Sequence, residues 1–83
     1  MYVHIGEEVA IQAQSVTAVI DLETVLPGQQ SITEFINSED DLNRLQYLTE
    51  DIPRSVIVTT DRTYISSLSV GVIRRRIENK EYF

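Results

Sequence analysis

The chain has 83 residues, with 13 acidic and 7 basic side chains and a net charge of −6. This length fits a single domain over residues 1–83, and the negative total argues against a generally basic nucleic-acid binder. The absence of cysteine excludes disulfides, thiol catalysis and cysteine-based metal sites, and a single histidine cannot form a histidine cluster.

The charge is distributed unevenly along the chain. Residues 1–53 hold ten acidic residues and one basic residue, a net charge of −9, whereas residues 54–83 hold six basic and three acidic residues, a net charge of +3. Asymmetry of this kind points to an anionic partner. A chain this short buries only roughly 60–65% of its unfolded surface, so we also expect it to oligomerise.

No apolar run approaches the roughly 18 residues that cross a bilayer. The opening residues 1–9 lack the basic start and long apolar stretch of a signal peptide. We therefore expect a soluble, cytoplasmic protein without a membrane partner.

Residues 2–22 alternate between apolar and polar side chains, which predicts two or three antiparallel strands with one buried face. Gly6 marks a turn, and Gln14-Ser15 marks a place for a bulge or bend. The single histidine, His4, is predicted on the face opposite the buried one, as a surface or interface residue rather than a ligand. The alternating apolar residues are Val3, Ile5, Val9, Ile11, Ala13, Val16, Ala18, Ile20 and Leu22.

A short helix is expected after the Leu26-Pro27-Gly28 turn. Ser31 is a candidate N-cap with Glu34 completing a capping box, and the helix is expected to end near Ser38. Its apolar stripe consists of Ile32, Phe35 and Ile36.

The acidic run at 39–41 either caps a second short helical turn or lies in a solvated connection. Its spacing is not that of a calcium loop. Residues 46–53 are predicted to form a loop or a weakly patterned edge strand that ends at Pro53.

Two β-branched runs, residues 55–59 and 63–67, are separated by three residues and predict a β-hairpin. Ser69 then caps a C-terminal helix, on which Val70, Ile73 and Ile77 form a stripe that packs on the sheet. The fold class is therefore α+β, a small antiparallel sheet with two short helices.

The C-terminal helix carries the candidate anion site. With Ile73 buried, steps of 100° per residue spread Arg74, Arg75 and Arg76 around the solvent side, and Lys80 extends the charged flank. Guanidinium groups suit phosphate oxygens, and each contact with DNA releases counterions. The alternative is a solvated face whose charges offset the helix dipole.

Two further arginines stand at the ends of predicted strands. Arg54 precedes one strand and Arg62 lies in the hairpin turn, where each side chain can reach a partner. Alternatively, each pairs locally, with Asp51 or Asp61, at a gain of about 0–1 kcal/mol.

No catalytic motif is visible. Ser66, Ser67 and Ser69 lack a nearby base or an oxyanion frame, and there is no phosphate loop or dinucleotide fingerprint. We expect no enzymatic activity, no catalytic residues, no cofactor and no metal. The aromatic residues are too scattered for a single-strand stacking platform, and Tyr64 is expected to pack in the core or an interface.

Three segments resemble the bacterial extracellular matrix regulators, most closely their RemB-like branch. These are residues 1–8, residues 53–59 and residues 64–69, the last preceding a basic helix; the resemblance covers essentially the whole chain. It implies a cytoplasmic, non-enzymatic regulator of biofilm matrix genes. It also implies a LytTR-like subunit that assembles into a ring and holds DNA on its outer surface through arginines.

This chain departs from the DNA-binding sister branch at three positions. By ungapped alignment, Ser15, Asp51 and Ile52 stand where that branch has arginines, whereas Arg54 is retained. Two hypotheses follow. The first is an oligomeric transcriptional regulator that contacts DNA through Arg54, Arg62, Arg74, Arg75, Arg76 and Lys80. The second is an interaction protein that does not bind DNA and instead assembles with itself or with a basic paralogue that it modulates.

Overall fold

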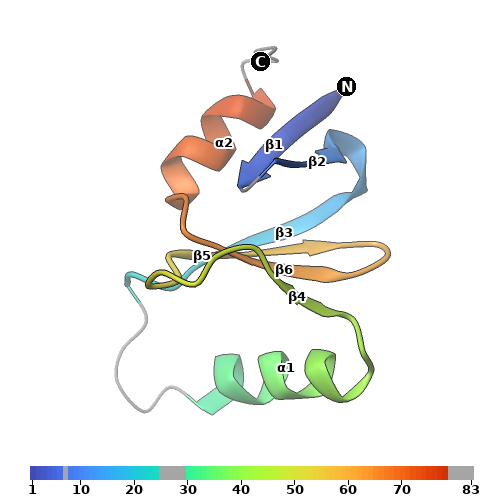
Figure 1. Cartoon of the computed structure of the whole chain (residues 1–83), viewed down its shortest axis with the longest axis vertical. Coiled ribbons are helices and arrows are strands. Elements are labelled where there is room, and N and C mark those ends of the chain that lie inside the picture. Colours follow the sequence, from blue (N-terminus) through green and yellow to red (C-terminus); the bar gives the residue numbers. More distant parts are fainter. Residues whose placement is uncertain (7, 25–29, 79–83) are drawn as a thin grey trace.

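The computed structural model of the chain describes residues 1–6, 8–24 and 30–78. Its centre is a four-stranded sheet in the order β3-β5-β6-β4, formed by β3 (Val16–Asp21), β4 (Leu45–Tyr47), β5 (Ser55–Thr59) and β6 (Thr63–Ser66). One face of this sheet carries α1 (Gln30–Asp41). The other face carries α2 (Val70–Glu78) and a separate hairpin of β1 (Tyr2–Gly6) and β2 (Val9–Gln12) (Figure 1).

The α+β class and the two helices are as predicted, but the sheet is neither single nor wholly antiparallel. Among the described strands, β1 and β2 pair only with each other. β3 pairs antiparallel with β5, which lies more than thirty residues later in the sequence. β4 runs parallel to β6, with Leu45 opposite Thr63 and Tyr47 opposite Ile65. A parallel neighbour requires a crossover connection, which alternation within one short strand does not reveal.

The expected break at Gln14-Ser15 is a one-turn 3-10 helix over Ala13–Ser15. The expected buried face of the strand after it is confirmed at Val16, which packs against the core, but is wrong at Ala18. The β3–β5 register shifts between Val16 and Ala18, and a bulge of this kind exchanges the two faces of a strand. As a result Ala18 is exposed and Val19 packs against the core.

The main core lies between the β1–β2 hairpin, α2 and the facing side of the central sheet. Ile5, Ile57 and Ile73 are completely buried there, one from each of these layers. His4 is half-buried between the buried Val3 and Ile5, on the opposite face as predicted. Val3, Ile11 and Leu48 complete the buried cluster.

The β5–β6 hairpin is confirmed, with Val58 opposite Thr63 next to the turn, although β6 ends one residue early, at Ser66. Thr59 closes the turn, since its hydroxyl donates to the Arg62 carbonyl (2.6 Å) and accepts from the Arg62 amide (3.0 Å). Ser69 is confirmed as the cap of α2, because its Oγ accepts from the Val72 amide at 3.2 Å. Val70 and Ile73 are buried beneath the helix and Ile77 is partly buried.

α1 differs from the prediction at both ends. Ser31 lies inside the helix and not at its N-cap, and the helix continues past Ser38 to Asp41. Asn43, with φ of 59°, then ends it by donating to the Asp40 carbonyl while the Arg44 amide donates to the Glu39 carbonyl. This pair of bonds is a Schellman motif. The Leu26-Pro27-Gly28 turn lies outside the described residues.

Glu39 is neither a cap nor solvated. It is the one buried residue of α1, 7% exposed, and it accepts hydrogen bonds from Thr63 Oγ1 and from Arg44 Nε, the latter at 3.1 Å. No buried side-chain nitrogen or oxygen among the described residues lacks a partner. The carboxylate therefore ties α1 to β6 and to the connection before β4.

Candidate nucleic-acid interface

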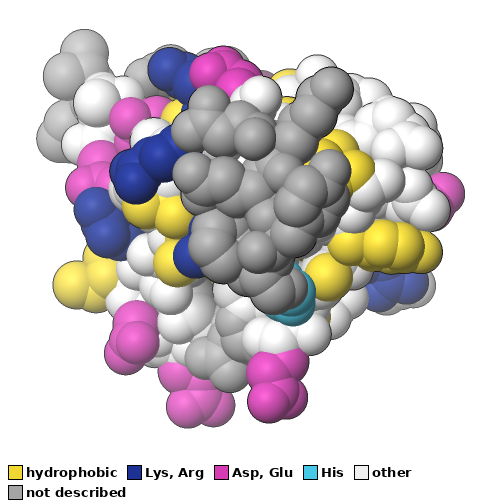
Figure 2. Space-filling view, turned by 90° about the horizontal axis from the view of Figure 1, so that it is seen from above, with side chains coloured by type: hydrophobic (Ala, Val, Ile, Leu, Met, Phe, Trp, Pro, Cys, Tyr) yellow, Lys and Arg dark blue, Asp and Glu magenta, His cyan; other side chains and the backbone are white. Residues whose placement is uncertain are grey.

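Arg74 and Arg75 are exposed on α2, as the helical spacing predicts. Burial of Val70 and Ile73 turns this side of the helix toward solvent. Within the described residues, neither guanidinium group takes part in a hydrogen bond or an ion pair. Basic side chains gather on the α2 side of the face seen in Figure 2.

Arg76 is not part of this exposed group. Its side chain is half-buried and its Nη1 donates to the His4 carbonyl at 2.9 Å. The fan of three exposed arginines is therefore wrong in its third member, because α2 packs against β1 and turns this side chain toward the β1 backbone. Arg76 fastens the helix to the hairpin. Lys80, the fourth predicted member, lies outside the described residues.

Arg54 pairs with neither Asp51 nor a neighbour in sequence. Its Nε lies 2.9 Å from Glu23 Oε1, and the two side chains are 48% and 45% exposed. An ion pair this exposed contributes about 0–1 kcal/mol, so a phosphate can replace the carboxylate at little cost.

Arg62 is exposed at the hairpin turn, and its Nη1 donates to Gln46 Oε1 at 3.2 Å. The predicted local pair with Asp61 is not observed. The hydrogen bond instead joins the hairpin turn to β4. The sequence does not predict this contact, because Gln46 is sixteen residues away from Arg62.

The structure does not gather the predicted site residues into one patch. Arg54 precedes β5 and Arg62 follows it, so a five-residue strand of about 13 Å separates them. The exposed pair on α2 is a third location. A continuous basic surface would therefore need several subunits.

The three positions at which this chain departs from the arginines that the resemblance implies can be placed in the structure. Asp51 and Ile52, for which the resemblance implies arginines in DNA-binding relatives, are both exposed, Ile52 at 84%, and present a carboxylate and an alkyl group. Ser15 is half-buried, and its Oγ donates to the Gln12 carbonyl at 2.7 Å.

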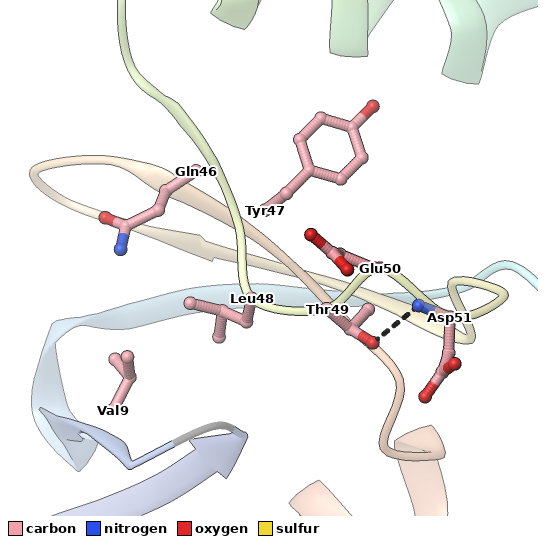
Figure 3. Close-up of a pocket in the computed structure, with 7 residues that line it drawn as sticks. All are labelled: Val9, Gln46, Tyr47, Leu48, Thr49, Glu50 and Asp51. Atoms are coloured by element: carbon pink, nitrogen blue, oxygen red, sulfur yellow. Dashed lines mark hydrogen bonds between the residues drawn. The ribbon is translucent and has the colours of Figure 1, made fainter.

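Sequence reasoning missed a groove along β4. It has a volume of about 670 Å³ and is lined by Val9, Gln46, Tyr47, Leu48, Thr49, Glu50 and Asp51 (Figure 3). Residues 46–53 were expected as a loop or edge strand, but not as a lining surface. The signal was the combination of aromatic and acidic residues just before Pro53.

No three His, Asp or Glu side chains in the described ranges lie together in a way that could hold a metal ion. None of the helices described is both long and apolar enough to span a membrane.

The fold and surface define a small α+β protein with an exposed basic helix beside a compact sheet. The chain belongs to the RemA-like family, extracellular matrix regulatory protein A-like, whose model matches residues 2–77. This membership implies a role in extracellular matrix regulation. No curated protein matches the chain.

Proposed function

We propose that this protein is a RemB-like, cytoplasmic regulator of biofilm matrix genes that acts as an oligomer on DNA and has no enzymatic activity. The observation that carries the proposal is the exposed pair Arg74 and Arg75 on α2 in a member of the RemA-like family. A LytTR-like subunit arrangement in a ring is part of the same proposal.

The contacts are to DNA phosphates. Arg74 and Arg75 offer planar donors that suit phosphate oxygens, and the exposed Arg54 exchanges Glu23 for a phosphate. Arg62, at the other end of β5, reaches a different stretch of the backbone. Arg76 acts indirectly by holding α2 in place. Lys80, which lies outside the described residues, is a further phosphate contact in this proposal.

DNA binding requires assembly because the arginines of one subunit lie at three separate places: before β5, at the β5–β6 turn and on α2. In a ring, repetition of the exposed pair on α2 creates a basic rim although each chain carries a charge of −6. The acidic groups of the other half are screened beyond about 8–10 Å at physiological salt. Sequence preference then arises from DNA shape and bending over the rim.

A second function is favoured by a specific observation, the exposed Asp51 and Ile52 at positions where the sister branch has arginines. A carboxylate repels phosphate. The alternative is therefore an interaction protein that does not bind DNA and modulates a basic paralogue.

Titration of duplex DNA against the protein between about 50 and 200 mM salt distinguishes these functions. We expect a steep decrease in affinity with salt for both a matrix promoter fragment and a random duplex. The variant Arg74→Gln/Arg75→Gln should flatten the log–log slope by about 2 for each engaged subunit.

A matched control separates a local site from the effect of bulk charge. Gln30→Glu/Thr33→Glu also makes the net charge more negative by two, but it changes exposed residues of α1 on the other face of the sheet. Acidic residues suit this first helical turn, so the control should fold. Equal loss of DNA binding in both variants would contradict a local phosphate site on α2. No binding by the oligomeric protein at 50 mM salt would favour the second function.

A further inference from the structure

Among the described residues, no strand pairs with the outer edge of β4. β4 is the last strand in the order β3-β5-β6-β4. The Arg44 carbonyl and the Leu48 amide both bond to β6, and backbone groups alternate in direction along a strand. Leu45 and Tyr47 therefore direct their N–H and C=O groups away from the sheet.

The groove along this edge has an aromatic side and an acidic rim. The Tyr47 ring and the Glu50 carboxylate point to the α1 side of the segment, whereas Asp51 points to the other side (Figure 3). Tyr47 is 61% exposed. The Thr49 hydroxyl accepts from the Asp51 amide at 2.9 Å and thereby shapes the turn that presents both carboxylates.

The charge of this groove selects its occupant. Glu50 and Asp51 are exposed, and within the described residues neither carboxylate takes part in an ion pair or a hydrogen bond. They lie in the part of the chain with a net charge of −9, so a phosphate backbone is repelled here and a cationic chain is attracted.

We propose that the edge of β4 binds an extended, arginine-bearing segment of a partner protein as an added strand. The partner backbone pairs with Leu45 and Tyr47, and its alternate side chains point to the two sides of the groove. An arginine on one side stacks on the Tyr47 ring and bonds Glu50, and Asp51 receives a cation from the other side.

The occupant is a different protein and not a second copy of this chain. Arg74 and Arg75 lie on the helix α2 and so cannot be part of an added strand. Arg54 and Arg62 flank β5, whose two edges are already paired with β3 and β6. The described residues thus offer no extended basic segment with a free edge. The proposal goes beyond DNA binding and does not depend on it, because it uses the opposite charge and another surface.

The test uses the full chain and a blocked six-residue peptide of alternating arginine and valine, followed by amide NMR shifts at about 50 mM salt. We expect the largest shifts over residues 45–51. Peptides with glutamate in place of arginine, or with alternate backbone nitrogens methylated, should not bind. Glu50→Gln/Asp51→Asn should weaken binding roughly tenfold, as expected for loss of about 1.4 kcal/mol.

The control variant Asp61→Asn/Glu78→Gln makes the same change in net charge at two exposed acidic residues outside the groove. It should alter peptide affinity less than twofold. Equal weakening in the two variants, binding of the methylated peptide, or no binding at 50 mM salt would overturn the proposal. Dissociation of an oligomer by the peptide, seen by light scattering, would also overturn it and assign the groove to a second copy.

DNA titration of the same variants keeps this test separate from the proposed function. Glu50→Gln/Asp51→Asn should retain or slightly increase DNA affinity, because it removes negative charge and leaves α2 intact. Arg74→Gln/Arg75→Gln should bind the peptide normally. Loss of peptide binding in the α2 variant would contradict a site on β4.

Discussion

Glu39 accepts hydrogen bonds from Thr63 Oγ1 and Arg44 Nε while only 7% of its surface is exposed. Replacement by glutamine removes the charge that both donors face and places an amide group between them. We expect Glu39→Gln to lower the free energy of unfolding by about 1–3 kcal/mol, the cost of disturbing a buried, charge-assisted network. Urea denaturation measures this change.

The neighbouring Asp40→Asn is the control for Glu39, since Asp40 is exposed and its substitution should change stability by less than about 0.5 kcal/mol. Equal free energies of unfolding for Glu39→Gln and Asp40→Asn would show that the buried Glu39 carboxylate stabilises the fold no more than an exposed carboxylate does.

Two glycines should respond to alanine with opposite signs. Gly6 has φ of +140° and an added Cβ would lie 3.2 Å from Ser66 Oγ, so Gly6→Ala should destabilise the fold by about 1–3 kcal/mol. Gly71 lies in α2, where the nearest atom to a new Cβ is 3.9 Å away. Gly71→Ala should stabilise by about 0.5–1 kcal/mol, and thermal unfolding of both variants checks the two signs.

At the scale of the element, α1 ends where its backbone can form a Schellman motif. Asn43 adopts φ of 59°, which glycine accepts freely and alanine does not. We expect Asn43→Gly to keep or slightly raise stability and Asn43→Ala to lower it by about 1 kcal/mol. Urea titration followed by helical circular dichroism distinguishes them, and a loss with glycine equal to that with alanine would mean that the Asn side chain matters instead.

The elements that the sequence predicts well are those whose signals are local. The β5–β6 hairpin follows from two β-branched runs beside a short turn, and α2 follows from Ser69 and a stripe of apolar residues. The end of α1 is also locally encoded, since Asn43 favours a left-handed backbone. The acidic run before it instead suggested the cap of a second helical turn or a solvated connection.

The elements that sequence reasoning missed depend on distant partners. Glu39 is buried because Thr63, 24 residues away, donates to it, and Arg54 pairs with Glu23 over 31 residues. β4 has only three residues and acquires its strand character from β6. The same limit applies to the candidate site, in which the exposure of Arg74 and Arg75 was predictable but the engagement of Arg76 by the His4 carbonyl was not.

At the scale of the whole molecule, the fold separates two kinds of surface. The basic helix α2 lies on one face of the central sheet, and the acidic groove follows the β4 edge. One subunit therefore presents a basic and an acidic surface at different places, although its net charge is −6.

The small size of the chain also bears on assembly. Leu42 and Ile52 are 64% and 84% exposed, and β3 is an edge strand without a completely buried side chain. Open edges and exposed apolar side chains favour association between copies.

We expect light scattering to give a mass that is a multiple of 9.5 kDa. Leu42→Ser or Ile52→Ser should shift the equilibrium toward the monomer on dilution, whereas Thr33→Ser, on the exposed side of α1, should not. A wild-type mass of 9.5 kDa at all concentrations would contradict a ring. In that case the separated arginines of one subunit would also be too few for tight DNA binding.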